Sequence, residues 1–135
     1  MTPVFCTVKQ DPENGLYGDC VRACVASILD MKSEDVPHFY HDGDGDAAFD
    51  RMRAWLADHG RIPAYFPISE KIDPFAYMAD KYADVEYMLF HSTVDGDHCI
   101  VGRNDKIAHN PAWFRTAITG AHSQGVWIVI ILARL

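Results

Sequence analysis

Apolar residues along the chain follow two spacings, which predict helices in the first half and strands in the second. Residues 20–31 are almost wholly apolar behind Asp19, a good N-cap, so this segment predicts a helix buried on most sides. Residues 47–59 carry apolar side chains at helical spacing and end before Gly60, a typical helix C-cap. Residues 74–82 predict a further amphipathic helix.

Short apolar runs bounded by turn residues predict the strands. They are residues 4–8, 62–66, 85–93, 99–103, 106–109 and 126–132, with Pro63 interrupting the second run. The pair Asn104-Asp105 predicts a two-residue hairpin turn. Helices come first and a mostly antiparallel sheet follows, which indicates an α+β fold with a central N-terminal helix packed on the sheet. At this length we expect a single domain over residues 1–135.

Charge and composition disfavour several classes of protein. A formal net charge of −7 argues against nucleic acid and anionic membranes as main partners. The longest apolar run, residues 126–133, is far shorter than a membrane span, and the first residues lack the pattern of a secretory signal. The four cysteines show no paired CxxC spacing, which favours free thiols. We therefore expect a cytoplasmic protein without nucleic-acid or membrane partners.

The strongest chemical signal is a cysteine at the start of the first predicted helix and a histidine at the start of a predicted strand. Cys20 follows Gly18-Asp19, where unpaired backbone N–H groups and the positive end of the helix dipole favour the thiolate. His98 opens an apolar run about eighty residues later. A thiol and an imidazole in such places are the two halves of a cysteine-nucleophile site.

Each of these residues also has an ordinary structural interpretation. Cys20 is then a small buried residue, and His98 is a surface or hairpin-edge histidine. His91 and His109 are competing candidates for the base. Three further residues have structural assignments: Cys24 and Cys99 in the core, and Trp113 either in the core or lining a cleft.

Several short motifs follow one another through most of the chain. They are Gln10, Gly18-Asp19-Cys20 with the helix after it, Val36-Pro37-His38-Phe39, Trp55-Leu56 before Gly60, His98-Cys99-Ile100-Val101 and His109-Asn110-Pro111. In this order they resemble papain-like cysteine hydrolases, most closely the small bacterial and phage branch similar to bacteriocin-processing (double-glycine) peptidase-like domains. The resemblance implies a papain-like fold. It also implies that Cys20 is the nucleophile, His98 the general base, Asn110 the residue that orients the histidine and Gln10 an oxyanion donor.

The chemistry of these roles has its own physical basis. Gln10 and the backbone N–H of Cys20 would stabilise an oxyanion, an effect worth ~3 kcal/mol per donor in other enzymes. Asn110 would accept a hydrogen bond from one ring nitrogen of His98 and so fix which nitrogen faces the thiol. In the predicted hairpin, His98 lies nearly opposite Pro111, one step from Asn110, whereas Asp105 lies at the far, turn end. We therefore expect Asn110 beside His98.

Two apparent metal sites do not fit the requirements of a metal. The run Asp42-Gly43-Asp44-Gly45-Asp46 lacks the glycine and glutamate that an EF-hand loop needs at its sixth and twelfth positions. Cys20, Cys24 and His98 do not have a typical zinc spacing. We expect neither a metal nor another cofactor.

The sequence thus favours a cysteine-nucleophile hydrolase that cleaves a peptide, isopeptide or amide bond through a thioester, with a peptide or protein as substrate. Two alternatives stay open. One is a catalytically inactive papain-like module that binds a peptide or a partner protein. The other is a deamidase or transglutaminase that uses the same residues with a different acyl acceptor.

Overall fold

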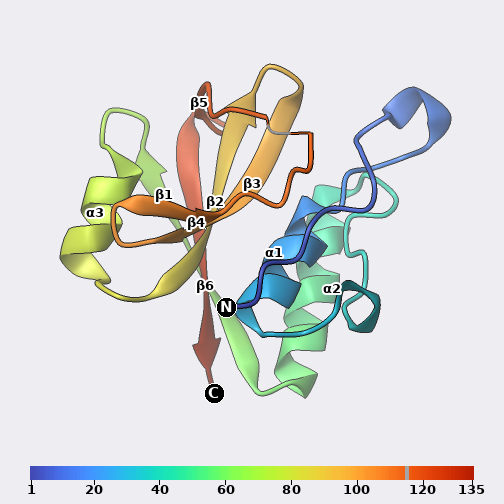
Figure 1. The fold of residues 1–135 in the computed structure, drawn as a ribbon, viewed down its shortest axis with the longest axis horizontal. Coiled ribbons are helices and arrows are strands. Elements are labelled where there is room, and N and C mark those ends of the chain that lie inside the picture. The colour runs from blue at the N-terminus through green and yellow to red at the C-terminus, as the bar shows by residue number, and fades with distance from the viewer. Residues whose placement is uncertain (115) are drawn as a thin grey trace.

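In the computed structural model, which describes residues 1–114 and 116–135, helices lie on both faces of one antiparallel sheet (Figure 1). The helices are α1 (Cys20–Ile28), α2 (Gly45–Asp58) and α3 (Pro74–Lys81), with short 3₁₀ turns at Pro12–Asn14 and Ser33–Asp35. The strands are β1 (Arg61–Ser69), β2 (Glu86–Thr93), β3 (Gly96–Arg103), β4 (Lys106–His109), β5 (Gly120–Ala121) and β6 (Val126–Arg134). The predicted α+β class is confirmed.

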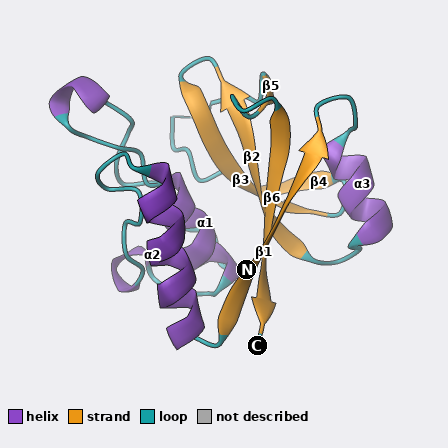
Figure 2. Ribbon diagram, turned by 180° about the vertical axis from the view of Figure 1, so that it is seen from behind, coloured by secondary structure: helices purple, strands orange, loops and turns teal. Residues whose placement is uncertain are grey.

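The sheet runs in the order β1-β6-β2-β3-β4, with the short β5 paired to β2, and every pairing is antiparallel. Helices α1 and α2 cover one face, and α3 covers the other (Figure 2). The predicted packing of the first helix on an antiparallel sheet is therefore confirmed. The position of α3 on the opposite face was not part of that prediction.

Each face of the sheet has its own hydrophobic cluster. On the α1 and α2 face, the cluster contains side chains of both helices, including Met52 and Leu56 of α2. It also contains alternate residues of the strands, including Met88 and Val101. On the α3 face, Met78 packs with the strand residues that alternate along the chain with those of the first cluster. This division follows from the alternation of side chains along a strand, which sends successive residues to opposite faces.

Side-chain caps explain where α2 and α3 begin. The carboxylate of Asp44 accepts a hydrogen bond from the backbone N–H of Ala47, at 3.0 Å. Asp73 accepts one from Phe75 N–H, at 2.9 Å. Helix α1 ends at Ile28, three residues before the predicted end, because Asp30 adopts a left-handed backbone with φ of 56°.

Strand β1 is longer than predicted and includes two prolines. Pro63 was expected to interrupt the strand, yet the pairing with β6 continues from Arg61 to Ser69 through Pro63 and Pro67. Strand β1 lies at the edge of the sheet, and residues four apart direct their backbone nitrogens the same way. The missing N–H groups are thus compatible with the unpaired side of an edge strand.

Two predictions about strands are wrong. Residues 4–8 form no strand, because side chains and carbonyls of other segments satisfy their backbone groups, as described below. Strand β3 begins at Gly96 instead of Cys99, so His98 lies inside the strand and pairs with His91 of β2. The polar residues before His98 look like a loop in the sequence, but they complete the hairpin with β2. The short strand β5 was not predicted.

Within the described part of the chain, no helix combines the length and the hydropathy that crossing a membrane would require.

Candidate functional site

Cys20 is the first residue of α1, and Asp19 before it anchors the N-terminal segment. The carboxylate of Asp19 is fully buried and accepts hydrogen bonds from the backbone N–H groups of Thr7 and Val8, each at 3.0 Å. Arg22 also donates to it, at 2.7 Å. Burial alone would raise the pKa of Asp19, but these hydrogen bonds and the Arg22 charge hold it below its ordinary value.

The predicted capping role of Asp19 is wrong, and the difference matters for chemistry. The side chain of Asp19 accepts no hydrogen bond from the backbone N–H groups of the first turn of α1, because it is directed to the N-terminal segment and to the Arg22 side chain. The first N–H groups of a helix have no acceptor within the helix. Cys20 is the first residue of α1, so its backbone N–H is one of these groups and would serve as a donor to an oxyanion.

His98 and Asn110 are joined as predicted. Nε2 of His98 donates to Oδ1 of Asn110, at 3.1 Å. The amide orientation of Asn110 is set by two further partners, since Oδ1 also accepts from Ala112 N–H at 3.0 Å and Nδ2 donates to the carbonyl of Thr116 at 3.2 Å. With Nε2 protonated, Nδ1 of the neutral imidazole is the nitrogen that can take a proton.

Cys20 and His98 act on each other through hydrogen bonding and charge. Burial lowers the pKa of His98, but Cys20 and Asn110 outweigh it and raise the pKa above the ordinary histidine value. His98 in turn lowers the pKa of Cys20. The structure thus brings together Cys20, His98 and Asn110 from α1, β3 and the segment after β4.

The pKa of Cys20 nevertheless differs from the prediction. A helix N-terminus favours the thiolate, but hydrogen bonding with Cys99 and burial of the thiol together raise the pKa of Cys20 well above its ordinary value. Cys99 is fully buried, as is Cys24, which confirms both as core residues. The Sγ atoms of Cys24 and Cys99 lie 3.6 Å apart, and all four thiols are free.

Gln10 is tied to the segment that leads into Cys20. Its side-chain Oε1 accepts a hydrogen bond from the backbone N–H of Gly18, at 2.7 Å. The side chain is exposed, and the Nε2 group, which an oxyanion would require, has no partner among the described residues. Gln10 is therefore bonded to Gly18, which lies two residues before Cys20, and no contact joins Gln10 to the thiol in the described structure.

The two competing histidines have other surroundings. His109 is buried, and its Nε2 bonds to the carbonyl of Val4 at 2.7 Å, which fixes the N-terminal segment against the end of β4. His91 is fully buried and bonds through Nδ1 to the carbonyl of Ser92, at 3.0 Å. The rings of His91 and His98 meet edge to face, with centroids 5.6 Å apart. Of the three histidines, only His98 has the Asn110 partner.

Sequence reasoning missed Phe114 and Lys9 near this site, whereas it left Trp113 either in the core or lining a cleft. The ring of Phe114 lies 6.3 Å from that of His98, and Trp113 meets Phe114 edge to face at 5.3 Å. Lys9 places its ammonium 5.2 Å from the Phe114 ring. Two aromatic residues shortly after Asn110 were a possible signal. Trp113 is 57% exposed, which excludes it from the core and leaves the predicted cleft position.

The acidic residues after His41 have structural partners. Asp42 forms an ion pair with Arg51 at 2.6 Å and accepts a hydrogen bond from Asp44 N–H, while Asp44 caps α2. Among the described residues, no group of histidine, cysteine or acidic side chains is arranged to hold a metal ion.

The chain was compared with known proteins, and no protein-family model, no curated protein and no solved structure matches it significantly.

Proposed function

We propose that this chain is a papain-like cysteine hydrolase that transfers an acyl group from a peptide, isopeptide or amide bond through a thioester at Cys20. The observation that carries the proposal is the hydrogen bond of 3.1 Å between His98 and Asn110. Cys20 acts on the same imidazole and raises its pKa. A thiol at a helix start, an imidazole and an orienting amide are the parts that nucleophilic cysteine chemistry needs.

Each residue then has one task. Nδ1 of His98 removes the thiol proton while Sγ of Cys20 attacks the carbonyl carbon, and the C–N bond breaks as His98 returns that proton to the leaving amine. Water, deprotonated by the same imidazole, then attacks the thioester carbon, the C–S bond breaks to release the acid, and His98 returns the proton to Sγ of Cys20. Asn110 keeps Nε2 protonated, and the backbone N–H of Cys20 supports the oxyanion, with Gln10 as a further donor.

The raised pKa of Cys20 favours one version of this mechanism. A thiol that stays protonated at neutral pH must lose its proton during attack, so His98 acts as a general base and not as half of a stable thiolate–imidazolium pair. Activity is then expected to increase with the fraction of His98 that is neutral. An acyl acceptor other than water would give deamidation or transglutamination with the same residues.

The test uses an activated ester, p-nitrophenyl acetate, because the natural substrate is not needed to form the thioester. The protein should release nitrophenolate and gain one acetyl group on Cys20, as detected by intact mass and peptide mapping. Cys20→Ala should abolish this, and His98→Ala should slow it by roughly 10²-fold. Cys6→Ala serves as the control and should react like the unmodified protein.

Acetylation that is unaffected by His98→Ala, or that falls on another cysteine, would refute the proposal. The same assay separates the second candidate, an inactive papain-like module that binds a peptide or a partner protein. The observation that favours this candidate is the combined effect of Cys99 and burial on the pKa of Cys20. An inactive module would leave Cys20 unacylated across the pH range in which the fold is intact.

A further inference from the structure

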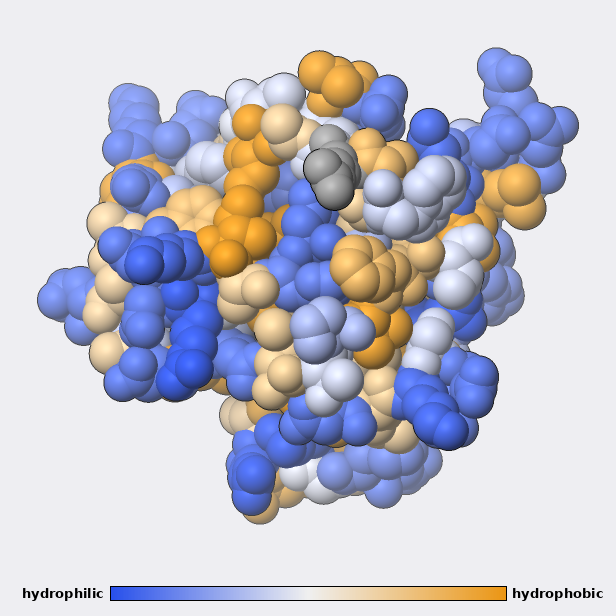
Figure 3. All heavy atoms as spheres, viewed as in Figure 1, coloured by the Kyte–Doolittle hydropathy of each residue, from blue (hydrophilic) through white to orange (hydrophobic). Residues whose placement is uncertain are grey.

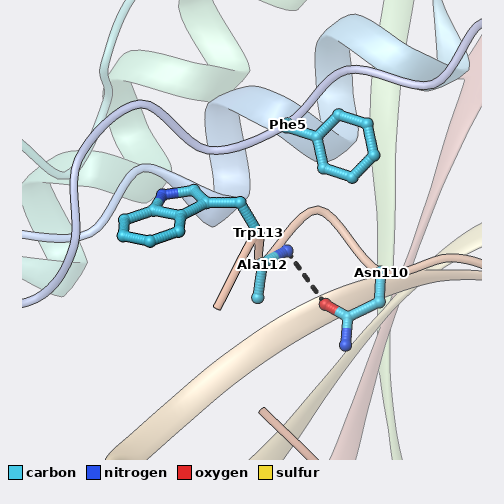
Figure 4. Close-up of a pocket in the computed structure, with 4 residues that line it drawn as sticks. All are labelled: Phe5, Asn110, Ala112 and Trp113. Atoms are coloured by element: carbon cyan, nitrogen blue, oxygen red, sulfur yellow. Dashed lines mark hydrogen bonds between the residues drawn. The ribbon is translucent and has the colours of Figure 1, made fainter. Parts of the chain in front are cut away.

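A hollow adjoins Asn110, whose Oδ1 accepts the hydrogen bond that orients His98. It is lined by Phe5, Asn110, Ala112 and Trp113 and has a volume of about 490 Å³. This falls within the ~300–1,000 Å³ that small-molecule sites occupy. Figure 4 shows Phe5 reaching into it from the N-terminal segment, whereas the other three residues come from the segment after β4.

The two aromatic residues that line the hollow are both exposed to solvent. Phe5 is 53% and Trp113 is 57% exposed. On the face shown in Figure 3, hydrophobic residues form separate patches among hydrophilic side chains. Two large rings line this one hollow from distant parts of the sequence. A ligand that covered them would gain binding free energy, because aromatic side chains contribute most to binding when they are removed from water.

Phe5 is held firmly in this position. The backbone N–H of Cys6 donates to the carbonyl of Pro111 at 2.8 Å, and the imidazole of His109 bonds to the carbonyl of Val4 at 2.7 Å. The Phe5 ring also meets the His109 ring edge to face, at 5.0 Å. The wall is thus organised before any ligand arrives, which lowers the entropic cost of binding.

The opposite wall leads directly to the proposed base. Trp113 contacts Phe114, and Phe114 contacts His98, with ring centroids 5.3 Å and 6.3 Å apart. Asn110 belongs to both the hollow and the proposed triad. A group seated between Phe5 and Trp113 therefore lies beside Asn110, the residue that orients the proposed base.

The hollow selects for an apolar group. Asn110 is the only polar side chain among the described residues that line it. Its Oδ1 already accepts two hydrogen bonds and its Nδ2 donates one, to Thr116. An amide occupied in this way has little left to offer a polar ligand, whereas the two rings offer apolar contact area.

We infer that Phe5 and Trp113 form an apolar subsite for an aromatic or large aliphatic side chain of the substrate, next to Asn110 of the proposed triad. This rests on the proposed function, since it names the substrate class of the same site. The preferred substrate is then a peptide or protein segment that carries such a residue, and Phe5 and Trp113 are specificity-determining residues.

Binding tests the subsite without any reaction. In the Cys20→Ala protein, N-acetyl-L-phenylalaninamide and N-acetylglycinamide are titrated and followed by NMR chemical shifts. The phenylalanine compound should bind at least ~10-fold more tightly, because burial of its side chain is favourable. Phe5→Ala and Trp113→Ala, each added to this protein, should remove the preference. Trp113→Phe should retain part of it.

Tyr65→Ala is the matched control, since Tyr65 is an aromatic residue 49% exposed on the edge strand β1, and it should leave the preference intact. Equal affinity for the two amides, or a preference that survives both alanine variants, would overturn the subsite. Acetylation of Cys20 by the activated ester is read separately. Binding without acetylation refutes the proposed function alone, and acetylation without an aromatic preference refutes the subsite alone.

Discussion

The thiol of Cys20 has two neighbours with opposite effects on its pKa, since Cys99 raises it and His98 lowers it. Cys99→Ala removes the largest influence that raises it. We expect the pH midpoint of Cys20 alkylation by iodoacetamide to shift downward by ~1 pH unit, because the thiolate is the form that reacts. Cys24→Ala, which removes a buried thiol of the same size one turn further along α1, is the control. An unchanged or higher midpoint in Cys99→Ala would show that another group protects the thiol.

Asn110 and Asp105 lie at opposite ends of the β4 hairpin and give a matched pair of variants. Asn110→Ala removes the partner of His98 Nε2, so the imidazole loses its preferred orientation and acetylation of Cys20 should slow by roughly 10- to 100-fold. Asp105→Ala, at the exposed turn, should leave the rate unchanged. The measurement is nitrophenolate release at a pH where His98 is neutral. Equal losses from both variants would contradict the orienting role.

The start of α1 depends on a buried carboxylate whose partners are far apart in the sequence. Asp19→Asn weakens the ion pair with Arg22 and the hydrogen bonds from Thr7 and Val8, so the free energy of unfolding should fall by ~3 kcal/mol at neutral pH. Urea denaturation measures it, with the exposed Asp50→Asn in α2 as the control.

The pH dependence of that loss has a definite sign. The pKa of Asp19 is lower in the folded chain than its ordinary value of 3.8, so the ionised carboxylate stabilises the fold fully above about that pH. The contribution disappears as the pH falls through the lower, folded-state pKa. The difference between the unmodified protein and Asp19→Asn should therefore shrink in strong acid. A difference that is constant with pH would show that Asp19 acts by packing alone.

Helices and most strands could be predicted because their signals are local. Asp44 and Asp73 stand where a helix N-cap is needed, and apolar spacing identifies what each helix buries. The closeness of Asn110 to His98 also followed from a local feature, the β3–β4 hairpin. Its register shifts by one between Gly102 and Val101, where Val101 pairs with His109, and the contact survives because Asn110 lies beyond the end of β4.

Features that depend on long-range contacts could not be predicted in this way. The carboxylate of Asp19 was expected to cap its own helix, but it bonds to residues twelve and eleven positions earlier. The pKa of Cys20 was expected to fall, and it rises through Cys99, a residue of a distant strand that alternation had assigned to the core alone. Phe5 reaches the site because His109 and Pro111 hold its segment. None of these partners is marked by spacing in the sequence.

The molecule as a whole places its proposed chemistry over one of two separate cores, and the two can be distinguished by a matched pair of methionines. Met52 is buried in the cluster on the α1 and α2 face, against which Cys20 packs, and Met78 is buried in the cluster under α3. Met52→Ala and Met78→Ala should each reduce the free energy of unfolding by about 2–5 kcal/mol, because each leaves a cavity in a closely packed region. Only Met52→Ala should alter the rate at which iodoacetamide labels Cys20 in the folded protein, since relaxation around that cavity moves α1 relative to β3. If both variants changed the labelling rate equally, the rate would depend on the overall stability of the fold. The two clusters would then not act independently on the site.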